Sequence, residues 1–132
     1  SIVIEDYSCE GGTLNITLRN NGRFSIAGFT IFGKENETVE IATEDLSKKI
    51  ISGGINASGR VYFSGLEGGT GSNSFPPGKS YPTQEGNFMS FDVSSYDQLP
   101  EVVITPVRRV EWQDRNLMAV CGRASIEETV NC

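Results

Sequence analysis

Apolar side chains recur at every second position along much of this chain, and this pattern limits the fold more than any other feature. Within residues 13–19, Leu14, Ile16 and Leu18 alternate with polar residues. Successive side chains of a β-strand point to opposite faces, so this spacing gives a strand with one buried and one solvated face. The alternation predicts an all-β fold and places Asn15 on an outer face.

Turn-forming residues separate the predicted strands at short intervals. Gly11-Gly12 and Asn20-Asn21-Gly22 flank the strand just described, and both residue types tolerate the left-handed backbone of tight turns. A stretch rich in Gly, Ser and Pro predicts a long surface loop at residues 67–82. Roughly eight short, mostly antiparallel strands with frequent turns are typical of an immunoglobulin-like β-sandwich. We expect residues 1–132 to form a single domain, since a chain of this length can bury one core.

Three segments are less regular. Residues 24–32 predict a strand with a bulge or bend near Ala27-Gly28, because the apolar positions change register there. Residues 45–55 suit either a strand or a helical turn. Residues 116–121 and 124–130 predict a closing antiparallel pair of strands.

Composition argues against several classes of function. Lys and Arg total 11 against 17 Asp and Glu, a net charge of -6, so we expect no nucleic-acid partner. The chain contains no histidine, the commonest general base and metal ligand. Its acidic residues show neither a catalytic pair nor the spacing of a calcium loop. We therefore expect a protein that is not an enzyme and that holds no cofactor or metal ion.

The three cysteines, Cys9, Cys121 and Cys132, are an odd number without a CxxC pair, which argues against a zinc site. If the first and last strands run side by side and parallel, Cys9 and Cys132 lie at the same end of neighbouring strands. Cys121 and Cys132 are too far apart along an extended strand, at about 3.3 Å per residue, to form a bond. We predict a Cys9–Cys132 disulfide with Cys121 as a free thiol in the core; a Cys9–Cys121 bond is the alternative.

Three Asn-x-Ser/Thr sequons are N-glycosylation candidates, at Asn15, Asn36 and Asn56. Together with the predicted disulfide they favour an extracellular or cell-surface location. No stretch approaches the roughly 18 consecutive apolar residues of a membrane-spanning helix, so we expect no membrane anchor within these residues.

One part of the chain concentrates cationic and aromatic side chains: Arg108, Arg109, Trp112 and Arg115. Such a group is suited to a subunit contact or to stacking on a glycan. The plainer interpretation, which we prefer, is a twisted hairpin with exposed arginines and a partly buried tryptophan.

The chain begins with three apolar residues in succession, Ile2, Val3 and Ile4. Apolar residues on both faces of a strand indicate that both faces are covered. The cover is either this domain, which we prefer, or a neighbouring subunit, for which Ile2 and Ile4 are the candidate contacts.

Several of these segments resemble a known group of surface proteins. The strand Ile16-Thr-Leu-Arg-Asn-Asn-Gly22 fits the pattern I-T-x-R-N-x-G, and residues 1–32 resemble the start of the globular domain of archaeal type IV pilin-like and archaellin-like proteins. Val103-Ile-Thr-Pro-Val107, with the late cysteines, is similar to the C-terminal part of the same group. Pro77-Gly78-Lys79-Ser80 before Phe91-Asp92-Val93 resembles a turn of cell-surface immunoglobulin-like modules. The likeness is poor over residues 44–74.

The resemblance implies an extracellular structural domain, the outer part of an archaeal pilus or archaellum-type filament built from copies of the subunit. In that group a hydrophobic N-terminal helix packs in the filament core. Residues 1–132 include no such helix, so contact with a membrane would require one outside them, and polymerisation without it would require exchange of the apolar first strand. The alternative function is a cell-surface adhesion module that binds a glycan or a protein through residues 66–82 and 108–115.

Overall fold

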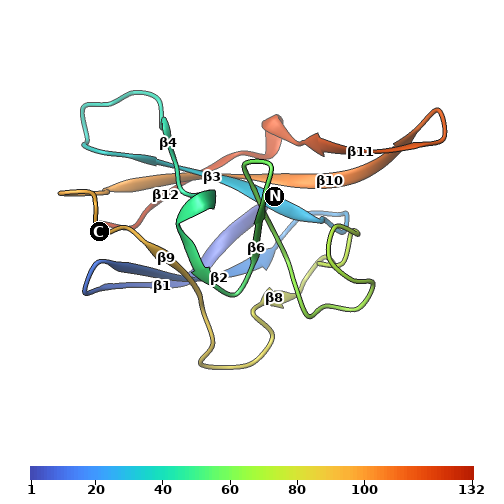
Figure 1. Cartoon of the computed structure of the whole chain (residues 1–132), viewed down its shortest axis with the longest axis horizontal. Helices are drawn as coiled ribbons and strands as arrows, with labels where there is room; N and C mark the ends of the chain where they lie inside the picture. Colours follow the sequence, from blue (N-terminus) through green and yellow to red (C-terminus); the bar gives the residue numbers. More distant parts are fainter.

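Two antiparallel β-sheets packed face to face form this protein, in a computed structural model that describes all residues, 1–132 (Figure 1). The first sheet has the strand order β1-β2-β9-β5, with β8 also paired to β2. Its strands are β1 (Ile2–Glu10), β2 (Thr13–Asn20), β5 (Ile50–Ser52), β8 (Ser80–Tyr81) and β9 (Met89–Asp92).

The second sheet has the order β11-β10-β3-β7-β6, with β12 also paired to β10 and β4 to β3. Two short 3-10 helices, η1 (Ser47–Lys49) and η2 (Gly122–Ala124), connect strands. The strands are β3 (Gly28–Lys34), β4 (Glu44–Asp45), β6 (Ile55–Ala57), β7 (Arg60–Tyr62), β10 (Glu101–Trp112), β11 (Arg115–Val120) and β12 (Ile126–Thr129).

The all-β sandwich predicted from the alternation is confirmed, although it has twelve strands rather than roughly eight. The additional strands are two or three residues long, too short to show an alternation. The segment at residues 45–55, which suited either a strand or a helical turn, contains both, as η1 followed by β5.

The core lies between the sheets and is formed by the alternating residues. Leu14, Ile16 and Leu18 of β2 are fully buried, as predicted. Phe63, Phe75 and Tyr81 pack as an aromatic group, with Phe63 centred 4.7 Å from Phe75 and 4.9 Å from Tyr81. Because Phe75 is buried and bridged to Ile26, the predicted surface loop at residues 67–82 was wrong in part: it returns to the core.

Close backbone approach explains the glycine at the start of β3. A Cβ on Gly28 would lie 2.3 Å from the carbonyl oxygen of Val61 in β7. Any larger residue there would force the two strands apart. The change of apolar register that the sequence shows near Ala27-Gly28 is therefore the point where the chain enters the second sheet.

Strand β10 organises the second sheet because both of its edges are used. One edge pairs with β3 from Glu101 to Val107. The other edge pairs with β12 over residues 101–104 and with β11 over residues 107–112. The predicted closing pair of strands was wrong: β11 and β12 follow one another along β10 and do not pair with each other.

A bulge in β1 changes which of its residues face the core. The register with β2 shifts between Ile4 and Asp6, so that Cys9 lies opposite the buried Leu14. A shift of one residue exchanges the two faces of a strand. Cys9 therefore points between the sheets although it is an odd-numbered residue and the inward-facing Ile2 and Ile4 are even-numbered.

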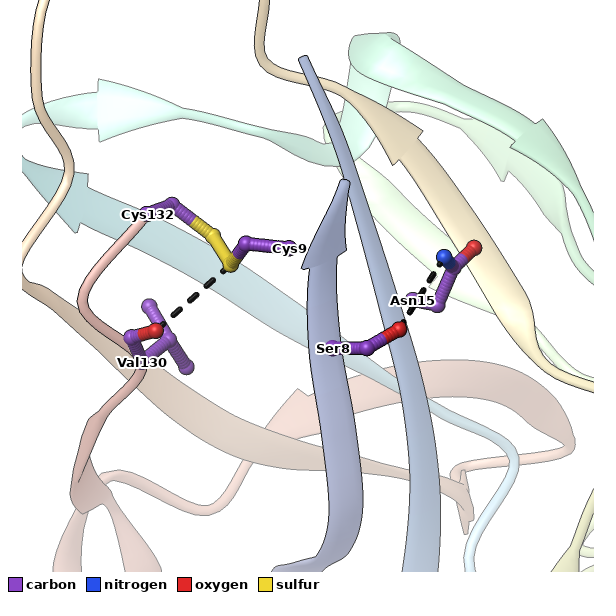
Figure 2. Close-up of a disulfide and its surroundings, with 5 residues drawn as sticks. All are labelled: Ser8, Cys9, Asn15, Val130 and Cys132. Atoms are coloured by element: carbon purple, nitrogen blue, oxygen red, sulfur yellow. Dashed lines mark hydrogen bonds between the residues drawn. A yellow bond between two sulfur atoms is a disulfide. The ribbon is translucent and has the colours of Figure 1, made fainter. Parts of the chain in front are cut away.

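Cys9 forms a disulfide with Cys132, with a Cα–Cα distance of 5.4 Å (Figure 2). The pairing agrees with the preferred prediction, but the strand arrangement behind it was wrong. β1 belongs to the first sheet, whereas β12 belongs to the second. Cys132 follows β12, and its backbone bonds to Leu99, which precedes β10. The disulfide thus joins the two sheets. The thiol of Cys121 is free and half-buried at the surface, not in the core as predicted.

The domain itself covers one face of the start of the first strand, and Val3 on the other face is only half-buried. Ile2 is fully buried and Ile4 is half-buried against the core. Ile2 is therefore wrong as a candidate for contact with a partner in this fold. Strand exchange through β1 would require the removal of these side chains from the core.

Replacing both Cys9 and Cys132 by serine should lower the free energy of unfolding by about 2–5 kcal/mol, because the bond closes nearly the whole chain into one loop. Urea unfolding measures this change. Cys121→Ser is the control and should change the stability by less than about 0.5 kcal/mol, as expected for a surface position. A reductant that destabilises the double variant as much as the native protein would contradict the assignment.

Candidate functional site

A two-stranded arm extends from the second sheet. Beyond Val107, strand β10 has lost β3 as a neighbour and pairs along its length only with β11. Gln113 and Asp114 make the turn, both with left-handed backbone (φ 48° and 61°). We call residues 108–119 the arm; its turn lies at the end of the molecule opposite the C-terminus (Figure 1).

Of the six predicted interaction residues four lie on the arm, and three of these share one of its faces. Arg108 and Trp112 lie on the same face of β10, and Arg115 lies directly opposite Trp112. Arg109 lies on the other face. The side chain of Trp112 is 62% exposed, so the preferred interpretation was right about a hairpin and wrong about a partly buried tryptophan.

Other apolar side chains extend this face. Leu117, opposite Val110, is 44% exposed. Phe24, which precedes β3, is 61% exposed, and the guanidinium carbon of Arg108 lies 4.6 Å from the centre of its ring. We call Phe24, Arg108, Trp112, Arg115 and Leu117 the arm face. It combines aromatic, aliphatic and guanidinium groups, which is the composition of protein contact sites.

Asn73 supports the base of the arm in place of a strand. Its side-chain nitrogen donates to the carbonyl oxygen of Arg109, and its side-chain oxygen accepts from the Arg109 backbone N–H, both at 2.8 Å. One side chain thereby supplies the donor and acceptor that β3 supplies earlier along β10. Nothing in the local sequence distinguishes Asn73 from other loop residues, so this role was missed.

Carboxylates gather at the other end of the molecule. Glu35, Glu44 and Asp45 lie near Tyr96, and Asp97 lines a surface hollow with it. Burial, and then the charges of these three carboxylates, raise the pKa of the Tyr96 hydroxyl. We call the segment of residues 35–45 together with Asp97 the acidic end. It lies at the opposite end of the long axis from the arm (Figure 1).

The nearby lysines neutralise the acidic end only in part. Lys34 is buried and bound to Glu101 at 3.2 Å and to Glu127 at 3.8 Å, so its charge is already matched. Lys48 and Lys49 line the same surface hollow as Glu44 and Asp45. Glu37 and Glu40, both exposed, add further negative charge to this end.

The three sequon asparagines differ in their surroundings. Asn15 lies on an outer face, but it is half-buried and bonded to Ser8 and Ser90. The side-chain oxygen of Asn36 accepts hydrogen bonds from the backbone and the hydroxyl of Thr38. Asn56, in the β6–β7 hairpin, is exposed. Asn56 is therefore the sequon most open to modification in the folded chain.

No three His, Cys, Asp or Glu side chains of the chain are grouped so that they could hold a metal ion. None of its helices has the length and apolar character to span a membrane. Comparison with protein-family models, curated proteins and solved structures finds no significant match.

The raised pKa of Tyr96 predicts a loss of stability at high pH. An unfolded tyrosine loses its proton near pH 10, whereas the folded chain still holds this proton. The contribution is fully present below about pH 10 and is lost as the pH rises through the raised pKa. Tyr96→Phe should therefore make the decline in unfolding free energy above about pH 10 less steep.

An ultraviolet difference titration of the native protein against Tyr96→Phe isolates the phenolate signal of Tyr96. Glu44→Gln removes one neighbouring charge and should move this titration to lower pH. A Tyr96 that titrates at or below the ordinary tyrosine value would contradict the proximity of the carboxylates.

Proposed function

We propose that this chain is a non-enzymatic structural domain that works outside the cell, as the outer globular part of an archaeal pilus or archaellum-type filament subunit. The β-sandwich closed by a disulfide supports an extracellular setting, since such bonds persist in oxidising compartments. The resemblance of residues 1–32 supports the pilin-like group. The observation that carries the proposal is the exposed arm face.

The arm face has the features of a contact surface. Trp112 and Leu117 are exposed apolar side chains on the same face of the arm, and the exposed ring of Phe24 lies against Arg108 at its base. Tryptophan and arginine are the residues most enriched among those that dominate binding energy. Leaving them exposed is unfavourable for an isolated domain, so we infer that a partner covers them.

The partner that we propose is the acidic end of a second copy. The arm carries Arg108, Arg109 and Arg115, which exceed its acidic residues Glu111 and Asp114. At the acidic end, carboxylates exceed the two unmatched lysines. In a head-to-tail arrangement, ends of opposite charge meet and attract each other. In an arm-to-arm arrangement, two positively charged arms meet and repel each other.

Head-to-tail contact also fits a filament. A contact between two different patches of the same chain is heterologous, and unless it closes into a ring it generates an open polymer. The arm and the acidic end lie at opposite ends of the long axis (Figure 1), so repeated contact would extend along that axis. In a complete filament this contact would join the outer domains, whatever holds the core.

Trp112→Ala and Leu117→Ser should each weaken self-association by about tenfold or more, as expected when a central contact residue is truncated. Sedimentation velocity over a range of protein concentrations measures this change. Ile51→Ser is the matched control, because Ile51 is as exposed as Phe24 but lies on β5, away from both ends. Higher salt should also weaken the association.

Charge exchange separates head-to-tail from arm-to-arm contact. Arg115→Glu alone and Glu37→Arg with Glu40→Arg should each reduce self-association. An equimolar mixture of these variants should restore it, because each variant keeps one native end and the two altered ends are again opposite in charge. A monomeric native protein at high concentration, or a mixture that fails to associate, would overturn the proposal.

A further inference from the structure

A polar cleft of about 550 Å³ lies on the outer face of the first sheet. Its floor is the middle of β2, β9 and β5, and its walls are residues 64–66 and the loop from Pro82 to Phe88. It shares no residue with the arm face or the acidic end.

Small polar side chains are in register across four strands, and three of them, Asn15, Ser52 and Ser90, form the floor. Ser8 pairs with Asn15, Asn15 with Ser90, and Ser90 with Ser52. Ser90 donates to the side-chain oxygen of Asn15 at 2.6 Å. The Asn15 amide nitrogen donates to Ser8 at 3.3 Å, as Figure 2 shows. These bonds fix the Asn15 amide in place and leave one of its two N–H groups available.

The walls add further neutral hydrogen-bonding groups. The amide nitrogen of Asn87 donates to the side-chain oxygen of Gln84 at 3.2 Å, which leaves the Gln84 nitrogen and the Asn87 oxygen free. Ser52 and Thr83 present exposed hydroxyls. The hydroxyl of Tyr81 is fixed by the carbonyl oxygen of Gly53 and by the N–H of Ser64.

No charged residue lines this cleft, although charged residues make up 21% of the chain. Phosphate and carboxylate ligands are recognised by Arg and Lys, and cations by carboxylates. A lining without either argues against all three kinds of ligand. What it offers is a set of fixed neutral donors and acceptors, together with the half-buried ring of Phe88.

We propose that this cleft binds an uncharged saccharide. Each sugar hydroxyl both donates and accepts, which matches the free amide groups of Asn15, Gln84 and Asn87 and the exposed hydroxyls of Ser52 and Thr83. The apolar face of a sugar ring can pack on Phe88. The proposal does not depend on self-association, because the arm belongs to the other sheet.

The test is a nuclear magnetic resonance titration of isotope-labelled protein made in cells without N-glycosylation, so that Asn15 is unmodified. The probes are cellobiose, mannobiose, lactose and diacetylchitobiose, with digalacturonic acid and inorganic phosphate as charged comparisons. At least one neutral disaccharide should give saturable shifts at Ser52, Asn87 and Ser90 and at the side-chain amides of Asn15, Gln84 and Asn87.

Gln84→Ala combined with Asn87→Ala should weaken that binding by about tenfold, since two hydrogen-bonding side chains are removed. Both residues are exposed, so the variant should keep the native spectrum elsewhere. Gln98→Ala, an exposed glutamine outside the cleft, is the matched control and should leave the affinity unchanged. Absence of shifts with all four neutral sugars, preference for a charged probe, or equal binding by the double variant would overturn the proposal.

Discussion

Strand β10 is longer than the sandwich that it helps to build, and the rest of the structure follows from how its backbone groups are paired. Over residues 101–107 it has a neighbouring strand on each edge for nearly every residue, and its inward side chains Val102 and Ile104 are fully buried. Beyond Val107, only β11 and the side chain of Asn73 meet its backbone. The first half therefore belongs to the core, and the second half is a ladder open to solvent.

The two ends of the molecule are consequently unlike each other. At the C-terminal end, the bulge in β1 turns Cys9 inward and the disulfide ties the first sheet to the second. At the arm end no covalent bond joins the sheets, and large apolar and cationic side chains stay exposed. We interpret this asymmetry as the basis of a head-to-tail contact. The outer face of the first sheet, with its row of small polar residues, is a third and separate surface.

Local patterns in the sequence could predict the strands but not their neighbours. The alternation of Leu14, Ile16 and Leu18 identifies β2 because a strand with one buried face has an apolar residue at every second position. The pairing of β11 with β10 produces no such pattern in the sequence, because any strand of suitable length can form hydrogen bonds with the free edge of β10. For the same reason the preferred disulfide was right while the strand order behind it was wrong: two chain ends can meet in more than one topology.

The candidate surfaces were predictable to different degrees. The concentration of arginines around Trp112 is visible in the sequence, but its exposure depends on where β3 ends, which local periodicity does not record. The cleft was missed because Asn15, Ser52 and Ser90 are distant in sequence and meet only through the register of three strands. Phe75 was assigned to a surface loop because its neighbours are Ser, Pro and Gly, yet its ring completes the aromatic core.

Hydrogen–deuterium exchange of the backbone amides along β10, at low and at high protein concentration, tests most directly whether the arm is an open ladder that a second copy covers. We expect slow exchange at residues 102–105 and at Val107 at both concentrations; Pro106 has no amide hydrogen. Apart from the Arg109 amide, which Asn73 binds, we expect faster exchange along residues 108–112 than in the core in dilute protein, and clear protection there in concentrated protein. Exchange along the arm that is equally slow at both concentrations, or that stays fast while protection appears elsewhere on the surface, would contradict this prediction.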